Sequence, residues 1–313
     1  MKNNRYNLIV ILGQTATGKT ALAARLARDL GSEIISADSR QVYRGMDLGT
    51  GKDLDDFVVD GVAVPYHLID IVDPDHEFSV FEYQKRFYES FLEISKRGIV
   101  PVMVGGTGLY IEAIIEGYRM RQVPEDFELR KRLEKKDDET LRARLRELNP
   151  VIHNTTDVLD RNRLLRALEI AEYTETHRLD KEEASPEIIP FIVGIRWERD
   201  VLRLRIRERL QKRFAMGMVE EVKSLHESGI SWEKLDFFGL EYRYVSLYLQ
   251  GEMEYDVMFE KLVTKIRQFS KRQGTWFRRM EKRGTLIHWI DGGGYRALEN
   301  LISKHLTIHD TKK

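Results

Sequence analysis

Residues 7–31, NLIVILGQTATGKTALAARLARDLG, decide the fold. The segment Asn7–Leu12 has continuous rather than alternating apolar residues, which is typical of a central parallel strand covered on both faces. A glycine-rich turn follows, and Thr20–Leu30 then carries alanines and leucines at helical spacing. Gly31 stands where a helix stop signal is expected. The stretch therefore predicts a buried strand, a tight loop and a helix in direct succession.

The alternation of strands and helices continues beyond this stretch. Short strands are predicted over Glu33–Ser36, His67–Ile71 and Ile99–Val104, and a helix over Ser79–Lys96. Strands that alternate with helices form parallel sheets with helices on both faces. The predicted fold class is therefore α/β, a doubly wound, mostly parallel sheet flanked by helices.

From Pro124 onward the strand-like apolar runs give way to charged segments with helical spacing, which predicts a helical insertion. Charged, leucine-spaced helices are predicted over Asp126–Lys136, Asp138–Leu148 and Leu159–Thr174. Glu182–Pro190, which contains two prolines, is interpreted as the linker that returns to the sheet.

The apolar segment Phe191–Ile195 is predicted to rejoin the sheet, and a long amphipathic helix is predicted over Tyr255–Gln273. We therefore expect a core of residues 1–119 and 188–313, and a small all-helical insertion domain of residues 120–187.

Composition excludes several classes of protein. The chain has 313 residues, of which 42% are hydrophobic and 33% charged, so an ordinary globular protein is expected. With no cysteine there is no disulfide, thiolate nucleophile or cysteine-ligated metal, and a cytoplasmic location is expected. No apolar run is long enough to span a membrane. The 51 basic residues balance 51 acidic ones, so total charge does not argue for a nucleic-acid partner.

Gly13–Thr20 matches the phosphate-loop pattern G-x-x-x-x-G-K-[ST] between the predicted strand and helix, where such a loop belongs. Backbone N–H groups of this loop surround phosphate oxygens, the lysine adds a positive charge, and the final hydroxyl ligates Mg²⁺. The predicted phosphate-binding residues are Gly13, Thr15, Ala16, Thr17, Gly18, Lys19 and Thr20. Thr20 is the predicted metal ligand and Mg²⁺ the predicted cofactor.

Asp38 follows the second predicted strand, at the edge where open α/β sheets bind ligands. Its carboxylate is suited to act near Mg²⁺ or to accept a proton from an incoming nucleophile as a general base. A helix N-cap is the alternative interpretation.

The strand over Ile99–Val104 ends in Gly105-Gly106-Thr107-Gly108, a second turn that favours anions. The hydroxyl of Thr107 is placed to donate to a phosphate oxygen. A simple helix cap with tight strand–helix packing is the alternative.

Basic residues cluster in two segments. From Glu260 to Gly284 there are nine Lys or Arg against two acids, and from Val201 to Arg213 six against one. Solvated helix faces are the ordinary explanation. Trp276 and Phe277 lie among these arginines, and this mixture of stacking surface and charge is typical of RNA contact.

Six motifs in order resemble those of the tRNA dimethylallyltransferases, also called tRNA isopentenyltransferases. They are GQTATGKT at Gly13–Thr20, ADSRQVYRGMDLGTGK at Ala37–Lys52, HLIDIVDP at His67–Pro74, VGGTGLY at Val104–Tyr110, RNRLLRALE at Arg161–Glu169 and KRQGTWFR at Lys271–Arg278. The resemblance covers nearly the whole chain.

The resemblance implies transfer of a dimethylallyl group from dimethylallyl diphosphate to the exocyclic N6 amine of the adenosine on the 3′ side of the anticodon, with release of diphosphate. The phosphate loop would then hold the allylic diphosphate, although loops with this pattern are also described as ATP-binding. Asp38 would accept the amine proton. Thr107 and, by its place in the family motif, Arg243 would contact the diphosphate.

The resemblance also implies the tRNA contacts. Family patterns place Asp38, Ser39, Arg40 and Gln41, together with Arg130, Asn162, Arg163 and Arg166, against tRNA. The insertion would clamp the anticodon stem-loop, and the basic helix would add Arg267, Lys271 and Arg272. A monomer that does not bind membranes is expected.

The chain departs from the family pattern at several positions. Gln14 stands where the family has Pro, and Asn162 replaces a Gln. In the segment Gly239–Tyr244, Glu241 and Tyr244 replace the Gly and Gln of a Gly-Tyr-Arg-Gln motif.

Two other functions share part of the pattern. A phosphate-loop kinase for a small molecule or nucleotide would have the same fold, Mg²⁺ and an acid at the position of Asp38. A non-catalytic RNA-binding protein that uses a nucleotide as a switch is the third hypothesis.

Overall fold

The computed structural model describes residues 6–118, 120, 123–148, 161–177 and 185–305. The chain divides into two compact units, Met1–Tyr118 with Pro186–Lys313, and Arg119–Ser185. The boundaries expected from the sequence, after residue 119 and before residue 188, differ from these by one and two residues.

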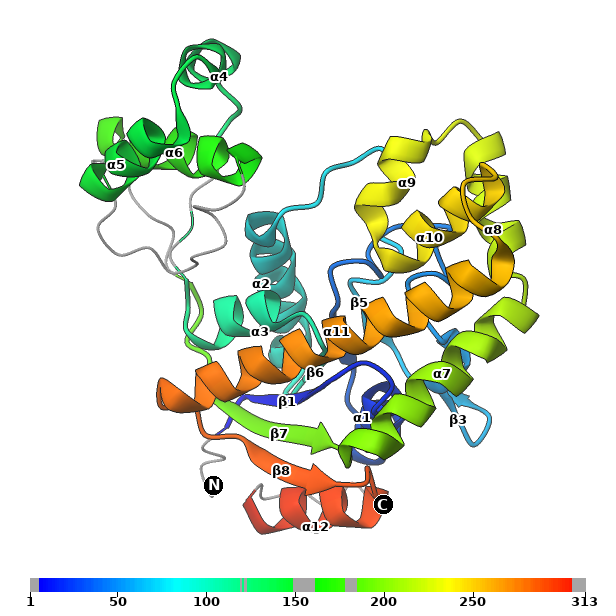
Figure 1. Ribbon diagram of the computed structural model, residues 1–313. Helices are drawn as coiled ribbons and strands as arrows, with labels where there is room; N and C mark the ends of the chain where they lie inside the picture. Colours follow the sequence, from blue (N-terminus) through cyan, green and yellow to red (C-terminus); the bar gives the residue numbers. More distant parts are fainter. Residues whose placement is uncertain (1–5, 119, 121–122, 149–160, 178–184, 306–313) are drawn as a thin grey trace. The chain divides into compact units, whose positions relative to one another are not determined.

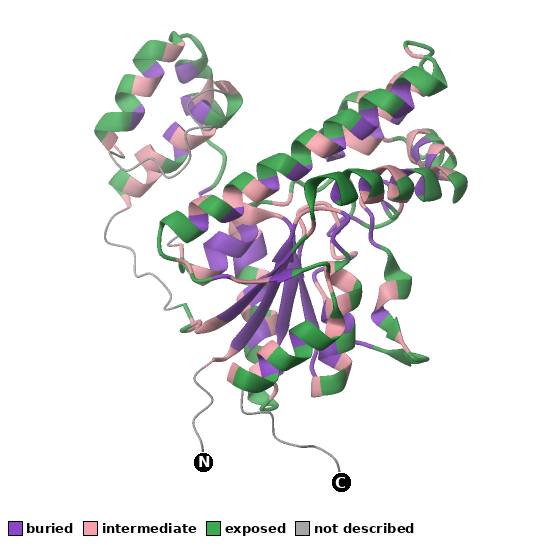
Figure 2. Cartoon of the chain, turned by 60° about the horizontal axis from the view of Figure 1, so that its bottom comes forward, coloured by how far each residue is buried: buried purple, intermediate pink, exposed green. Residues whose placement is uncertain are grey.

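The first unit is built on a six-stranded sheet in the order β5-β2-β6-β1-β7-β8, in which every pairing is parallel. The strands are β1 (Leu8–Gly13), β2 (Ile34–Ala37), β5 (Tyr66–His67), β6 (Val102–Gly105), β7 (Pro190–Arg196) and β8 (His288–Asp291). All six residues of β1 are buried, because neighbouring strands and helices enclose it on every side (Figure 2). The predicted doubly wound α/β fold is confirmed.

Helices cover both faces of the sheet (Figure 1). Helices α1 (Lys19–Leu30) and α12 (Tyr295–His305) pack on the face that receives Ile9 and Ile11 of β1. Leu8, Val10 and Leu12 point to the other face, because successive strand residues alternate. That face is covered by α2 (Val80–Lys96), α3 (Gly108–Ile115) and the end of α11 (Tyr255–Lys282).

A group of helices packs at one end of the sheet in the same unit. It comprises α7 (Arg199–Ala215), α8 (Met218–Glu227), α9 (Trp232–Phe238), α10 (Leu240–Leu249) and the first half of α11. Their apolar faces share one core with Val42, Tyr43 and Met46 of the loop after β2. This shared core fixes the loop that follows Asp38.

Smaller elements complete the first unit: the 3₁₀ turn η1 (Leu54–Phe57) and the hairpin of β3 (Val58–Val59) and β4 (Val62–Ala63). Across the part of the chain that the structure describes, no helix combines the length and the apolar character needed to cross a membrane.

Several elements differ from their predictions. Strand β6 begins at Val102, three residues after the predicted start at Ile99. The strand predicted over His67–Ile71 ends at His67, because Leu68 and Asp70 have positive φ angles of 63° and 55°, which no strand accommodates. Helix α11 continues nine residues past Gln273, to Lys282. Strand β8 was not predicted, because an edge strand of four residues that is largely half-buried has a weak apolar pattern.

The second unit contains three helices in its described residues: α4 (Phe127–Glu134), α5 (Asp138–Leu148) and α6 (Arg161–Thr176). They enclose a small leucine core of Leu129, Leu133, Leu141, Leu145, Leu164, Leu165 and Leu168. The leucine spacing therefore predicted these helices correctly. Of the predicted linker over Glu182–Pro190, residues 182–184 lie outside the described residues, residues 185–189 form no helix or strand, and Pro190 begins β7.

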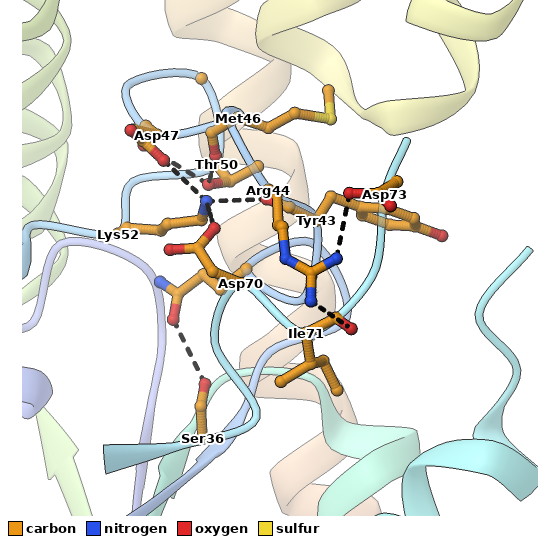
Figure 3. Close-up of polar contacts among 12 residues, drawn as sticks. Ser36, Tyr43, Arg44, Met46, Asp47, Thr50, Lys52, Asp70, Ile71 and Asp73 are labelled. Atoms are coloured by element: carbon orange, nitrogen blue, oxygen red, sulfur yellow. Dashed lines mark hydrogen bonds and ion pairs between the residues drawn. The ribbon is translucent and has the colours of Figure 1, made fainter. Parts of the chain in front are cut away.

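A buried lysine organises the loop after β2 (Figure 3). The side chain of Lys52 is fully buried, and its Nζ donates to the carbonyl of Tyr43 and to Asp47, both at 2.7 Å, and to Asp70. Arg44, on the same loop, instead forms an exposed ion pair with Asp73 at 3.0 Å. Lys52 therefore ties the loop after β2 to the segment that follows β5.

We expect Lys52→Met to lower the free energy of unfolding by about 1–3 kcal/mol, because a buried carbonyl and two carboxylates lose their donor. Arg44→Met is the matched control, and an exposed pair of this kind contributes at most about 1 kcal/mol. Urea unfolding of both variants measures the difference, and equal effects would show that burial of Lys52 carries no special weight.

Candidate active site

The phosphate loop lies between β1 and α1 and adopts a strongly curved conformation. Ala16 and Gly18 both have positive φ angles, 63° and 81°. The hydroxyl of Thr17 is turned inward and donates to the carbonyl of Gln14 at 2.8 Å. No side chain caps the start of α1, so its first backbone N–H groups are oriented as in an anion-binding helix terminus.

Helix α11 braces the loop from one side. Gln273 accepts from the backbone N–H of Thr15 at 2.8 Å through Oε1 and donates to the carbonyl of Gly106 at 2.9 Å through Nε2. Gln14 donates to the carbonyl of Ser270 at 2.8 Å and contacts its hydroxyl at 3.0 Å. A single amide therefore ties the phosphate loop to the second glycine turn. The departure at Gln14 provides a further link to α11.

The chain after β7 braces the loop from another side. The indole of Trp197 donates to the carbonyl of Thr17 at 3.0 Å, and Nε of Arg205 donates to the carbonyl of Ala16 at 2.8 Å. The guanidinium of Arg205 also lies 4.5 Å from the centroid of the Trp197 ring. Both loop carbonyls are thus occupied by protein donors.

A cavity of about 380 Å³ opens beside the loop within the first unit. Its polar wall includes Thr15, Lys19, Thr20, Asp38, Ser39, Arg40, Gln41, Thr107, Arg209, Arg213, Glu241, Arg243 and Gln273. Its apolar wall includes Phe57, Phe237, Phe238, Leu240, Ile266 and Phe269. Six residues predicted from the sequence as phosphate-binding, metal-binding or catalytic therefore meet in space with a largely aromatic surface: Thr15, Lys19, Thr20, Asp38, Thr107 and Arg243. Three residues predicted to bind tRNA, Ser39, Arg40 and Gln41, line the same cavity.

Asp38 lies at the carboxyl end of β2 and faces this cavity. Its Oδ1 accepts from the backbone N–H of Arg40 at 2.9 Å, which fixes the orientation of the carboxylate. Turns rather than a helix follow it, so the alternative of a helix N-cap is wrong.

Thr107 occupies the N-cap position of α3, yet its side chain makes no capping hydrogen bond. Its Oγ1 instead accepts from the backbone N–H of Ser39 at 3.1 Å. The close approach needs glycine beside it, because a Cβ on Gly105 would lie 2.2 Å from the carbonyl oxygen of Ala37. The hydroxyl of Thr107 and the carboxylate of Asp38 are thereby held at neighbouring strand ends.

Positive charge gathers around the loop. Lys19 is half-buried and its Nζ lies 3.4 Å from the carbonyl of Gln14. Desolvation together with the charge of Arg209 lowers the pKa of Lys19 to about 8. Burial and the same neighbour lower the pKa of Arg213 to about 10. The site thus holds three cations close together, an arrangement that favours an anionic ligand.

Arg209 and Arg213 of α7 were not among the predicted site residues. Arg209 forms an ion pair with Asp53 and lies 3.3 Å from the hydroxyl of Thr15. The run of six basic residues between Val201 and Arg213 was a visible signal, but spacing alone did not reveal which of them face the cavity.

Two family models match the chain. The model described as IPP transferase matches residues 41–280, and the model described as isopentenyl transferase matches residues 6–61. The protein named tRNA dimethylallyltransferase 1 from Syntrophus aciditrophicus (strain SB) is 60% identical over 300 residues, which is 96% of this chain and 98% of that protein. The chain belongs to the tRNA dimethylallyltransferase family.

Other relatives support the same family membership. A tRNA dimethylallyltransferase 1 from Geotalea uraniireducens (strain Rf4) is 56% identical and covers 92% of this chain and 93% of its own. The crystal structure of the full-length tRNA isopentenylpyrophosphate transferase from Bacillus halodurans matches with a TM-score of 0.69 and 32% identity over 96% of this chain and 97% of that one. A eukaryotic dimethylallyltransferase at 21% identity, with a TM-score of 0.76, shows the fold alone. The kinase hypothesis is not favoured.

Within the first unit, the remaining residues predicted from the dimethylallyltransferase resemblance lie around the same cavity or on α11. Arg243 lines the cavity and forms an ion pair with Asp236 at 3.1 Å. The guanidinium of Arg40 lies 4.9 Å from the centroid of Phe237. On α11, Lys271 and Arg272 are exposed, whereas Arg267 is half-buried and lies 3.4 Å from the carbonyl of Arg203.

The predicted tRNA-binding residues of the helical unit divide into two pairs. Arg130 and Arg166 both bind the buried carboxylate of Glu169, Arg130 through two hydrogen bonds of 3.0 and 2.9 Å. These two arginines therefore contribute to packing within the unit. Asn162 and Arg163 are exposed on α6.

Proposed function

We propose that this protein transfers a dimethylallyl group from dimethylallyl diphosphate to the N6 amine of the adenosine on the 3′ side of the anticodon in tRNA. The single observation that carries the proposal is the cavity. It combines a phosphate loop, a carboxylate at a strand end and an aromatic wall. The name tRNA dimethylallyltransferase of the 60% identical relative supports the same reaction.

The phosphate loop would bind the diphosphate of the substrate. Backbone N–H groups at the start of α1 and the ammonium of Lys19 would stabilise the charge that develops on the leaving diphosphate. The hydroxyl of Thr107 would add a donor from the neighbouring strand end. The aromatic and aliphatic wall is suited to the five-carbon allylic group, because that part of the substrate offers only apolar surface.

Asp38 would act as the general base. The amine nitrogen forms a bond to the allylic carbon, the carbon–oxygen bond to diphosphate breaks, and the amine proton passes to the Asp38 carboxylate. Its hydrogen bond from Arg40 keeps the carboxylate directed at one point of the cavity. Holding the weakly nucleophilic amine beside the allylic carbon would supply much of the rate.

Mg²⁺ fits the donor set as the expected cofactor. No cluster of three or more His, Asp or Glu able to hold a metal occurs within the described ranges. In phosphate loops the final Ser or Thr hydroxyl binds Mg²⁺, and the ion takes further ligands from substrate phosphates and water, so such a cluster is not required. Thr20 would be its ligand, and the ion would neutralise charge on the diphosphate.

For tRNA, we propose contacts from Ser39, Arg40 and Gln41, which line the cavity, and from the exposed residues of α6 and α11. The adenosine must leave its stack to reach Asp38, which costs a few kcal/mol that contacts to the stem would offset. Action in the cytoplasm as a monomer remains a prediction from the sequence.

A substrate assay separates this reaction from phosphoryl transfer. The protein is incubated with unmodified tRNA and Mg²⁺ and either labelled dimethylallyl diphosphate or ATP labelled at its terminal phosphate. We expect label in tRNA only from the allylic diphosphate, with excess ATP inhibiting weakly. Transfer of the ATP phosphate to any acceptor would favour the kinase instead.

Contacts from α11 to the tRNA backbone should appear in the salt dependence of binding. Arg272→Ala should reduce the slope of log affinity against log salt concentration by about 1, because one phosphate contact and its counterion release are lost. Lys223→Ala on α8, where the lysine pairs with Glu227, is the control and should keep the wild-type slope. An unchanged slope for Arg272→Ala would assign this face of α11 to solvent.

A further inference from the structure

We infer that Arg213 is an additional diphosphate-binding residue and that Glu241 balances its charge. The inference rests on the proposed function, because it takes the allylic diphosphate as the ligand of the phosphate loop. Arg213 was not a predicted site residue, and Glu241 stands where the family motif has Gly. The pair is therefore a feature of this chain that the general family pattern does not contain.

Arg213 is buried, and part of its guanidinium lacks hydrogen-bond acceptors. Its side chain is only 8% exposed, and Nε and Nη2 have no hydrogen-bond partner although both are shielded from solvent. Buried guanidinium donors without a partner carry a substantial energetic cost. A ligand that accepts from both donors would remove that cost.

The neighbouring carboxylates are too distant to satisfy these donors. Asp53 lies 3.8 Å from Nη2 and Glu241 lies 3.9 Å from Nη1, and both distances exceed a hydrogen bond. Asp53 is already engaged by Arg209. The two carboxylates therefore compensate the charge of Arg213 without occupying its hydrogen-bonding positions.

The guanidinium is placed beside the phosphate loop. Arg213 lines the same cavity as Lys19 and Thr15, and it also lines a smaller cavity with Thr15 and Ala16. Gly51 leaves room for it, because a Cβ there would lie 1.7 Å from Nη2 of Arg213. The backbone on that side is thus shaped around this side chain.

A diphosphate is the chemical class that matches. The planar fork of arginine donates two parallel hydrogen bonds to a phosphate group, and such charge-assisted pairs are strong. Lys19 and Arg209 bring two further positive charges to the same region. On binding, we expect Arg213 to bond phosphate oxygens while Glu241 continues to balance its charge.

The test is calorimetric titration of the full-length protein with inorganic diphosphate in the presence of Mg²⁺, combined with KM and kcat for dimethylallyl diphosphate. Arg213→Met should weaken diphosphate binding and raise KM about 10- to 100-fold. The diphosphate affinity and KM of Arg213→Lys should lie between those of the wild type and those of Arg213→Met. Arg207→Met is the matched control, because Arg207 is on the same helix and pairs with Glu260 outside the cavity.

The double variant Arg213→Met/Glu241→Gln distinguishes binding from packing. If the pair only balances buried charge, removing both charges should restore the wild-type affinity for diphosphate. If Arg213 binds the diphosphate, the double variant should remain as weak as Arg213→Met. Glu241→Gln alone should then keep or increase the affinity, because a negative charge beside the anion has been removed.

Two further measurements distinguish failure of this inference from failure of the proposed function. A wild-type protein that binds neither inorganic diphosphate nor the allylic diphosphate would refute the proposed function itself. If the wild type binds diphosphate and Lys19→Ala loses it, wild-type affinity in Arg213→Met would refute the inference alone. Loss of tRNA affinity in Arg213→Met with unchanged diphosphate binding would also overturn it, since a tRNA phosphate would then be the ligand.

Discussion

Lys19→Ala should reduce turnover about 10²- to 10³-fold while the protein remains folded, because it removes a positioned cation from the leaving diphosphate. The side chain of Lys19 lines the cavity, and its nearest hydrogen-bond acceptor is a carbonyl at 3.4 Å, so the folded state loses little when it is truncated. The readout is the initial rate of dimethylallyl transfer to tRNA at limiting allylic diphosphate, together with thermal unfolding.

The matched control for Lys19→Ala is Lys96→Ala, which truncates an exposed lysine in the last turn of α2. It should retain the wild-type rate. Near wild-type turnover by Lys19→Ala at limiting allylic diphosphate would mean that the loop does not hold the leaving group.

Asp38→Asn should lower turnover about 10²- to 10⁴-fold, because the amide is nearly the same size but does not accept the proton as a carboxylate does. The backbone N–H of Arg40 can still donate to the amide oxygen, so the loop should keep its conformation. Affinity for tRNA should change little. Single-turnover rates should therefore fall in this variant while equilibrium binding of tRNA stays near the wild-type value.

Asp73→Asn is the control for Asp38→Asn, since Asp73 is exposed and forms an ion pair with Arg44. It should leave both quantities unchanged. Equal losses of tRNA binding and chemistry in Asp38→Asn would make Asp38 a recognition residue, and the general base would lie elsewhere.

The elements that the sequence predicted are those whose signals come from residues adjacent in the chain. The apolar run before Gly13, the loop pattern and the helix after it form one continuous signal, and the structure has each element within one or two residues. The strand predicted after His67 failed because its end depends on positive φ angles at Leu68 and Asp70, which apolar pattern does not report.

The candidate site was only partly predictable for a related reason. Asp38 and Thr107 stand directly after strands, so the rule that ligands bind at strand ends located them. Gln273 binds the loop and Arg213 lines the cavity beside it, although both lie on helices more than 190 residues away in sequence. No local pattern indicates which face of a helix meets the site. Arg166 and Glu169 are three residues apart on α6 and form a readable pair, whereas the contact of Arg130 with Glu169 spans 39 residues.

Nucleoside analysis of the product tests the central claim most directly. Wild-type protein and Asp38→Asn are each incubated with dimethylallyl diphosphate, Mg²⁺ and an unmodified tRNA anticodon stem-loop, and the RNA is then digested and analysed by mass spectrometry. The wild type should yield N6-dimethylallyladenosine at the position on the 3′ side of the anticodon, with one diphosphate released per modified base, and Asp38→Asn should yield far less. Absence of this nucleoside from the wild-type reaction, with the protein folded and the stem-loop bound, would contradict the account.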